Sequence, residues 1–185
     1  GAVGRDGRLE KDVNLEVSQA LRRGLEAAGA QVTMTRDADS SVAAPGVPAD
    51  QELGARVRLA EEAGAQVFLS IHHNAKASVA EGRVSHGSHM YYFHPQSRVL
   101  AQTLAAPVAA AIGEPQYASF WRSFQVTRQT GMPAVLVEVN FLSNPALEAQ
   151  TRQSDYAARA AGGILQGLLE FFRRTQDTPV GAWGS

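Results

Sequence analysis

Glu10, His72 and Glu138 are the residues whose types and surroundings best suit them to chemistry. The chain has no cysteine, so thiolate metal sites and disulfides are excluded, and imidazole and carboxylate remain as the strong ligands for a transition metal. A carboxylate can also act as a general acid or base when its pKa is raised toward neutrality. Residues of these types can therefore hold a metal or act as acid and base.

Glu10 begins a predicted amphipathic helix over residues 10–28. Val13, Asn14 and Val17 follow it at the spacings i+3, i+4 and i+7, which place its side chain toward the buried face of that helix. A carboxylate on a buried face needs a partner. One interpretation is an acid at the helix start, stabilised by the helix macrodipole. The other is a functional carboxylate, whose partner the position alone does not name.

His72 and His73 follow directly on an apolar run, residues 67–71, that is typical of a buried strand. In open α/β sheets, ligands bind beyond the carboxyl ends of the strands, and both histidines stand at such an end. Neighbouring residues of a strand point to opposite sides, so at most one of the two is expected to face a given site. A histidine bonded only to backbone groups is the alternative for each.

Glu138 lies inside the apolar run 135–139, where an unpaired charge is costly and burial raises the pKa of a carboxyl group. Such a glutamate is either salt-bridged or catalytic. The sequence offers Arg56 and Arg128 as partners for an ion pair, and this structural interpretation stays open beside the catalytic one.

Two further groups of side chains give weaker signals. Three histidines surround an expected strand over residues 83–93: His86, His89 and His94. Their spacing suits a metal only loosely, and a surface or substrate-facing role is favoured. Three aromatic residues follow a stretch with glycine and proline: Phe120, Trp121 and Phe124. They either stack on a sugar or fill the core.

Helices that alternate with apolar strands must position these residues. Helices are expected over residues 10–28, 50–63, 95–112 and 154–174, and strands over residues 31–36, 67–71, 83–93 and 134–139. Asn144 and Pro145 match an N-cap followed by proline at the first helical position. Residues 37–50 are expected to form a surface loop. This order predicts an α/β fold: a single twisted, mostly parallel sheet flanked by helices on both faces.

The composition excludes several classes of protein. A length of 185 residues with 44% hydrophobic residues suits one compact domain. The formal net charge of -1 gives no basic footprint for nucleic acid. No apolar run approaches the roughly 20 residues that span a bilayer, so no membrane insertion is expected. The sequence also lacks the Gly-x-Ser-x-Gly elbow of serine α/β hydrolases.

Five sequence blocks resemble the zinc-dependent N-acetylmuramoyl-L-alanine amidases of the group called amidase type 3. In order, the blocks are Leu9–Leu15, Thr35–Asp37, Leu53–Arg56, Phe68–Ala75 and Met132–Asn144. The resemblance covers residues 1–174, which it marks as an amidase catalytic domain, and it leaves residues 175–185 as a C-terminal tail. Five ordered blocks are far more specific than any one of them.

The resemblance implies one Zn²⁺ and hydrolysis of the amide bond between N-acetylmuramic acid and the L-alanine of the peptidoglycan stem peptide. It implies Glu10 and His72 as zinc ligands and Glu138 as the catalytic glutamate. A zinc ion with an open position activates water and polarises the scissile carbonyl. Glu138 then takes the proton of the water and returns it to the departing amine, helped by a raised pKa.

The sequence departs from the family pattern in three places. Family members carry a further histidine ligand in a glycine-rich turn after a first strand, upstream of the stretch that here begins at Gly1, and that histidine and strand are absent. We expect them in a segment that precedes Gly1. His73 stands where a small residue is common, and Asn140 where glycine is usual. These two flank the expected site.

The implied substrate also suggests a partner and a place. The expected partner is peptidoglycan, and the protein is expected to act as a monomer. Its expected place is the periplasm or the extracellular cell wall, with an export signal upstream of the given sequence. A non-catalytic peptidoglycan-binding or regulatory module on the amidase fold is the alternative, supported by the absent histidine.

Overall fold

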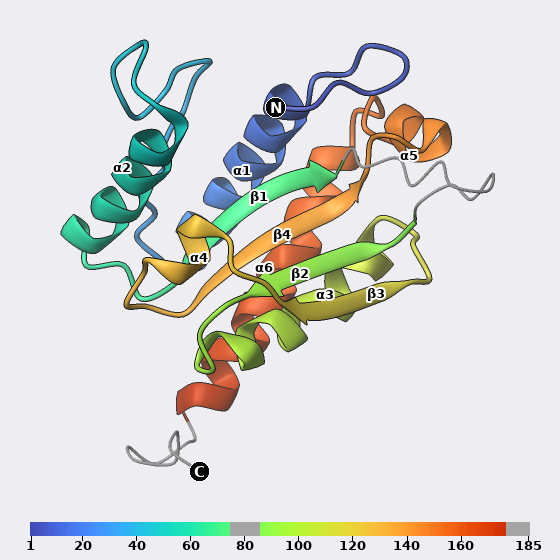
Figure 1. Ribbon diagram of the computed structural model, residues 1–185. Coiled ribbons are helices and arrows are strands. Elements are labelled where there is room, and N and C mark those ends of the chain that lie inside the picture. The colour runs from blue at the N-terminus through green and yellow to red at the C-terminus, as the bar shows by residue number, and fades with distance from the viewer. Residues whose placement is uncertain (75–85, 177–185) are drawn as a thin grey trace.

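The fold is built on one sheet of four strands in the order β1-β4-β2-β3, as seen in a computed structural model that describes residues 1–74 and 86–176. The strands are β1 (Phe68–Asn74), β2 (Ser88–Tyr92), β3 (Tyr117–Trp121) and β4 (Ala134–Phe141). β1 pairs with β4 and β2 with β3 in parallel, whereas β2 and β4 are antiparallel. The predicted mostly parallel α/β sheet is confirmed (Figure 1).

Helices cover both faces of the sheet. They are α1 (Glu10–Ala27), α2 (Ala49–Glu62), α3 (Ser97–Ala111), α4 (Gln125–Arg128), α5 (Pro145–Gln150) and α6 (Tyr156–Gln176). In the view of Figure 1, α3 and α6 lie behind the sheet, and α4 lies in front of it. The asparagine predicted as an N-cap begins α5, since the Asn144 side chain accepts a hydrogen bond of 3.0 Å from the N–H of Ala146.

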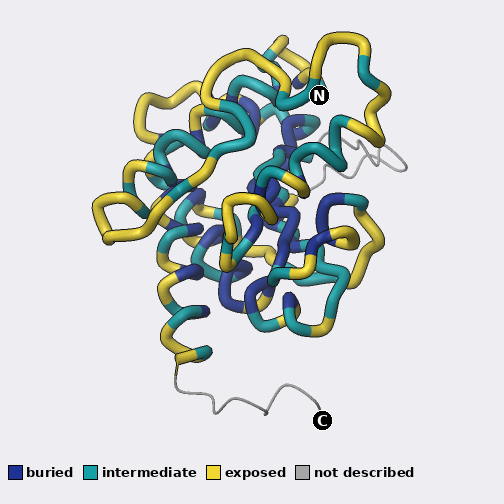
Figure 2. The backbone as a smooth tube through the Cα atoms, turned by 90° about the vertical axis from the view of Figure 1, so that its left-hand side faces the viewer, coloured by how far each residue is buried: buried dark blue, intermediate teal, exposed yellow. Residues whose placement is uncertain are grey.

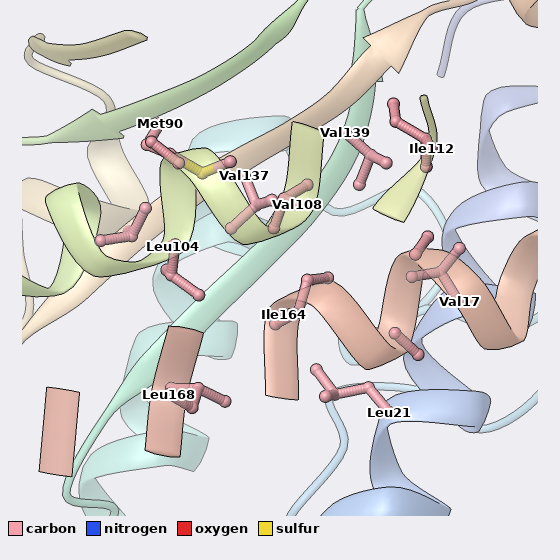
Figure 3. Packing of buried hydrophobic residues seen from close by; sticks show 14 of the residues in the cluster. Val17, Leu21, Met90, Leu104, Val108, Ile112, Val137, Val139, Ile164 and Leu168 are labelled. Carbon is pink, nitrogen blue, oxygen red and sulfur yellow. The ribbon is translucent and has the colours of Figure 1, made fainter. Parts of the chain in front are cut away.

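The main hydrophobic core lies between the sheet and the helices α1, α3 and α6. Side chains from all of these elements interlock in it (Figure 3), and Val17, Val137 and Ile164 have no exposed surface. A smaller cluster on the opposite face joins Ala60 of α2 and Val126 of α4 to the strands. Figure 2 shows the buried backbone gathered inside the molecule, with the exposed segments around it.

Two glycines let α6 pack closely on α3. A Cβ added at Gly167 would lie 2.7 Å from the Cα of Leu104 and 2.8 Å from the carbonyl oxygen of Thr103. That carbonyl cannot bond to residue 107 in the helical pattern, because Pro107 has no N–H. The second glycine, Gly163, comes equally near the backbone of Pro107. Any side chain at these positions pushes the two helices apart.

Gly167→Ala is therefore expected to lower the free energy of unfolding by about 2 kcal/mol, through overpacking against backbone that cannot yield. Urea unfolding followed by circular dichroism measures the change. Gly162→Ala is the matched control on the same helix, because an added Cβ there meets nothing within 4 Å. It should stabilise by roughly 0.5 to 1 kcal/mol through helix propensity. Equal effects of the two substitutions would contradict the packing argument.

The structure differs from the sequence prediction at one expected strand. Residues 31–36 form no strand, and in the described part of the chain β1 pairs only with β4. A cavity of about 770 Å³ lies beside β1, and its lining includes Val32, Met34, Val67 and Leu69. Strand propensity needs a neighbouring strand to be realised, and residues 1–74 and 86–176 supply none beside residues 31–36.

Candidate metal centre and catalytic carboxylate

Glu10 and His72 meet at one end of the sheet although they are far apart in the chain. Glu10 is the first residue of α1, and His72 lies near the end of β1. The Nδ1 atom of His72 lies 2.8 Å from Oε1 of Glu10. The other carboxylate oxygen accepts a hydrogen bond of 2.8 Å from the N–H of Ala2. The structure thus brings together the two residues predicted as zinc ligands.

The Glu10 carboxylate is held in its charged form. Burial alone would raise its pKa, but the hydrogen bonds from His72 and from the Ala2 N–H outweigh that effect. The result is a pKa lowered to about 2. Asn14 also donates to Oε1, at 3.3 Å. Glu10 is only 8% exposed, so a negative charge stands in a nearly closed environment and favours a cation beside it.

Glu138 stands next to His72 on the adjacent strand. The two residues are Cα partners in the parallel pairing of β1 with β4, which places their side chains on the same face of the sheet. Burial raises the pKa of Glu138 to about 7, with the Glu10 charge adding to the rise and His72 opposing it. Its Oε2 atom is buried and has no hydrogen-bond partner among the described residues.

The ion-pair interpretation of Glu138 is wrong for the described residues. Arg56 pairs instead with Glu52, at 2.8 Å, and Arg128 donates to the hydroxyl of Ser123. A carboxylate with a buried, unsatisfied oxygen and a pKa near neutrality can accept and return a proton.

His73 points away from this site, as the alternation along a strand predicts. It has no exposed surface, and its ring nitrogens contact Asn14 at 2.7 Å and the hydroxyl of Tyr156 at 2.9 Å. Burial lowers the pKa of His73 to about 3, so the ring is neutral. His73 is a structural histidine that ties α1 and α6 to β1.

The donor pair fits a zinc ion as two of its ligands. The two donor atoms, 2.8 Å apart, are near enough to each other that both could hold one ion. Nitrogen of imidazole and oxygen of carboxylate are both zinc donors. Within residues 1–74 and 86–176, no three His, Asp or Glu side chains are grouped closely enough to hold a metal by themselves.

The three remaining histidines do not gather. His86 lies 3.8 Å from Glu114, and His94 contacts the carbonyl oxygen of Arg128 at 2.8 Å. His89 differs from both, because it is the Cα partner of Glu138 in the antiparallel pairing of β2 with β4. Its pKa is lowered by burial. This supports the expected surface or substrate-facing roles and not a metal cluster.

A buried glutamate that the sequence did not single out holds the segment before Glu10. Glu148 of α5 is fully buried and accepts hydrogen bonds from the N–H groups of Asp6 and Arg8, each at 2.9 Å. A Cβ added at Gly4 would lie 2.4 Å from the Glu148 carboxyl group. In the sequence, Glu148 and Arg152 resemble an ordinary i,i+4 surface pair, which concealed this role.

Glu148→Ala is expected to lower the free energy of unfolding by about 3 kcal/mol, because it leaves backbone N–H groups without acceptors. Amide hydrogen exchange should show faster exchange at Asp6 and Arg8. Glu170→Ala is the control, since Glu170 forms a similar i,i+4 pair with Arg174 on an exposed surface. If the two substitutions cost the same, Glu148 does not anchor the segment.

None of the helices within the described residues combines the length and apolar character needed to cross a membrane.

Comparison with known proteins gives a consistent family. The family model described as N-acetylmuramoyl-L-alanine amidase matches residues 1–170. The amidase LytC of Bacillus subtilis is 32% identical over 94% of this chain, and the probable cell wall amidase LytH of Staphylococcus aureus is 31% identical over 89%. The chain spans 33% of the length of LytC and 50% of that of LytH.

Solved structures agree with the sequence relatives. The catalytic domain of CwlV, an N-acetylmuramoyl-L-alanine amidase from Bacillus (Paenibacillus) polymyxa var. colistinus, is 34% identical with a TM-score of 0.81. The match covers 94% of this chain and 90% of that domain. With the family match extending over most of its length, the chain belongs to the N-acetylmuramoyl-L-alanine amidase family.

Proposed function

We propose that this chain is the catalytic domain of a zinc-dependent peptidoglycan hydrolase that cleaves the amide bond between N-acetylmuramic acid and L-alanine. One observation carries the proposal. His72 lies in contact with the Glu10 carboxylate, and Glu138, whose pKa is raised to about 7, lies beside them at the same end of the sheet. The names of the relatives support the reaction class, since LytC and CwlV are N-acetylmuramoyl-L-alanine amidases.

Each residue has a chemical task in this proposal. Glu10 and His72 hold the metal, which when bound supplies a Lewis acid that activates water and polarises the scissile carbonyl. Glu138 takes a proton from the attacking water as the bond from water oxygen to carbonyl carbon forms. It then gives the proton to the amide nitrogen as the C–N bond breaks. The products are a lactyl carboxylate and a free L-alanine amino group.

Product analysis tests the proposed function. Purified protein, dialysed against chelator and then resupplied with zinc, is incubated with peptidoglycan, and the released fragments are identified by mass spectrometry. Intact stem peptides with a free L-alanine amine are expected, only in the zinc-supplied sample. Release of disaccharides, or of peptides cut inside the stem, would show a different bond specificity. Binding without release would favour a non-catalytic module on the same fold.

We further propose that a strand outside this sequence completes the sheet beside β1 and brings a third ligand, a histidine, to the metal. The cavity of about 770 Å³ along β1 supports this, because its lining joins apolar side chains of β1 to His72 at one end. If the gene encodes residues before Gly1, a version extended by them should bind zinc more tightly than residues 1–185. Equal affinity of the two would contradict the proposal.

The proposed substrate sets the proposed place of action. Peptidoglycan lies outside the bacterial cell membrane, so we propose a protein of the cell wall or periplasm that reaches it by export. LytH is named as a probable cell wall amidase, which supports this location. We also propose that the domain acts as a monomer. Sedimentation of the purified chain tests that point directly.

A further inference from the structure

An aromatic row lies on the same face of the sheet as Glu138. It consists of His89 and Tyr91 from β2, Phe120 from β3, and Phe124 just before α4. The rings of His89 and Phe120 are 5.3 Å apart, those of Tyr91 and Phe120 are 5.7 Å apart, and those of Tyr91 and Phe124 are 5.3 Å apart. Each ring of the aromatic row thus contacts at least one other.

The aromatic row is continuous with the candidate site. His89 is paired with Glu138 across the antiparallel strands, a position at which Cβ atoms lie about 4.5 to 5.5 Å apart. Tyr91 comes two residues later and points to the same face, and its Cα partner on the edge strand is Phe120. The aromatic row therefore begins beside the catalytic carboxylate and extends across β2 to the edge of the sheet.

Tyr91 of the aromatic row packs against the smaller hydrophobic cluster, but the outer part of the row does not fill the core. Phe120 and Phe124 belong to neither hydrophobic cluster, and Phe124 is 39% exposed. Large apolar side chains left partly open to solvent in one contiguous stretch mark a binding surface. The polar atoms in the row are few: the imidazole of His89 lies 3.3 Å from the Tyr91 hydroxyl. Apolar rings with a few polar groups at the rim form the usual lining of a small-molecule site.

The two parts of the proposed substrate, the stem peptide and the sugar, differ in charge, and this difference indicates which of them binds to the aromatic row. The stem peptide carries free carboxylates, which call for paired cations, whereas the sugar rings are uncharged and present apolar C–H faces. Among the described cationic side chains, only Arg122 lies over a ring of the row, 5.8 Å from the centre of Phe120. That is near the outer limit of a cation–π contact, so the described faces of these rings hold one distant cation and no paired cations.

We propose that the aromatic row is the glycan subsite of this domain and holds the N-acetylmuramoyl sugar whose lactyl amide is cut at Glu138. This inference rests on the proposed function, since it assigns one part of the same substrate to one part of the same face. Stacking of sugar C–H groups on Tyr91, Phe120 and Phe124 orients the substrate, and the polar rim at His89 meets its hydroxyl or acetamido groups.

Binding of glycan without stem peptides tests the inference separately from catalysis. The probe is a tetrasaccharide of alternating N-acetylglucosamine and N-acetylmuramic acid whose lactyl carboxyl groups are capped as methylamides. It is titrated into the protein and followed by the aromatic carbon and proton signals in NMR. Phe120→Ala and Phe124→Ala should each weaken binding by about fivefold, the effect of losing one aromatic contact. Tyr117→Ala is the matched control, an exposed aromatic on the same strand as Phe120 that points to the opposite face.

The control should bind the tetrasaccharide as the unchanged protein does. Three results would overturn the inference: no binding to the unchanged protein, equal weakening in all three variants, or weakening of free stem-peptide binding by Phe120→Ala with glycan binding unaffected. The last result would assign the aromatic row to the peptide. A protein that releases stem peptides yet ignores the tetrasaccharide refutes the subsite alone, whereas one that binds it and releases nothing refutes the amidase proposal alone.

Discussion

Glu138→Gln is expected to abolish amide hydrolysis and, in the same protein, to raise the free energy of unfolding at pH 8. Loss of the group that accepts and returns the proton should reduce kcat by roughly 10³-fold or more. The gain in stability arises because glutamine has the same shape but no charge to bury. Peptide release and urea unfolding measure the two effects.

The sign of the stability change follows from the pKa of Glu138. Folding raises it from 4.5 to about 7, so the folded state holds a proton that the unfolded state has lost between these values. The unchanged protein therefore loses stability as the pH rises through about 7, by up to about 3 kcal/mol. Glu138→Gln avoids that loss, so its advantage should be full at pH 8 and vanish below pH 4.5.

An exposed glutamate supplies the control for Glu138→Gln. Glu170 is paired with two arginines at the surface of α6, and Glu170→Gln should bring neither a gain in stability at pH 8 nor a loss of turnover. Turnover by Glu138→Gln within tenfold of the unchanged protein would remove Glu138 from the catalytic role. An unchanged free energy of unfolding at pH 8 would mean that its carboxylate is well solvated.

His72→Ala is expected to remove both zinc and activity. Glu10 then loses the neighbour that faces it at 2.8 Å, and the metal loses one of the two proposed ligands from this chain. Zinc affinity should fall by about 100-fold or more, since even weaker outer contacts of a metal site are worth 10- to 100-fold. Competition with a chromophoric chelator measures the affinity, and peptide release measures the activity.

His86→Ala is the matched control, because the side chain of His86 is half exposed and lies near Glu114. It should keep both zinc and activity. A His72→Ala variant that binds zinc as tightly as the control would exclude His72 as a ligand. Zinc bound with unchanged affinity but without turnover would instead place His72 in the reaction and not in the metal site.

Much of the fold and of the candidate site can be predicted from the sequence, because the spacing of apolar residues indicates the helices, the strands and the faces of each. The apolar run with one embedded carboxylate marks Glu138, and strand alternation predicts that at most one of His72 and His73 faces the site. The structure brings Glu10 and His72 together as the resemblance implies. Their roles as ligands, and that of Glu138 as a catalyst, stay predictions until zinc and turnover are measured.

What the sequence does not reveal depends on tertiary neighbours. β3 is an edge strand in which no residue is fully buried, so it lacks an apolar signature. The short helix α4 has only four residues, too few to show a helical pattern in the sequence. Residues 31–36 have strand propensity but no partner strand among the described residues. Glu148 takes its anchoring role from backbone N–H groups more than a hundred residues away. Contacts over such separations leave no local pattern.

The contact of Glu10 with His72 joins positions 62 residues apart, and a metal held between them would act as a removable cross-link. Anything that binds only the folded state adds to its stability by mass action, by about 1.4 kcal/mol for each tenfold excess of free ion over the dissociation constant. Scarcity of the ion would then lower the stability of the folded domain as well as its activity, although the core residues Val13, Val17 and Leu21 hold α1 in place without it.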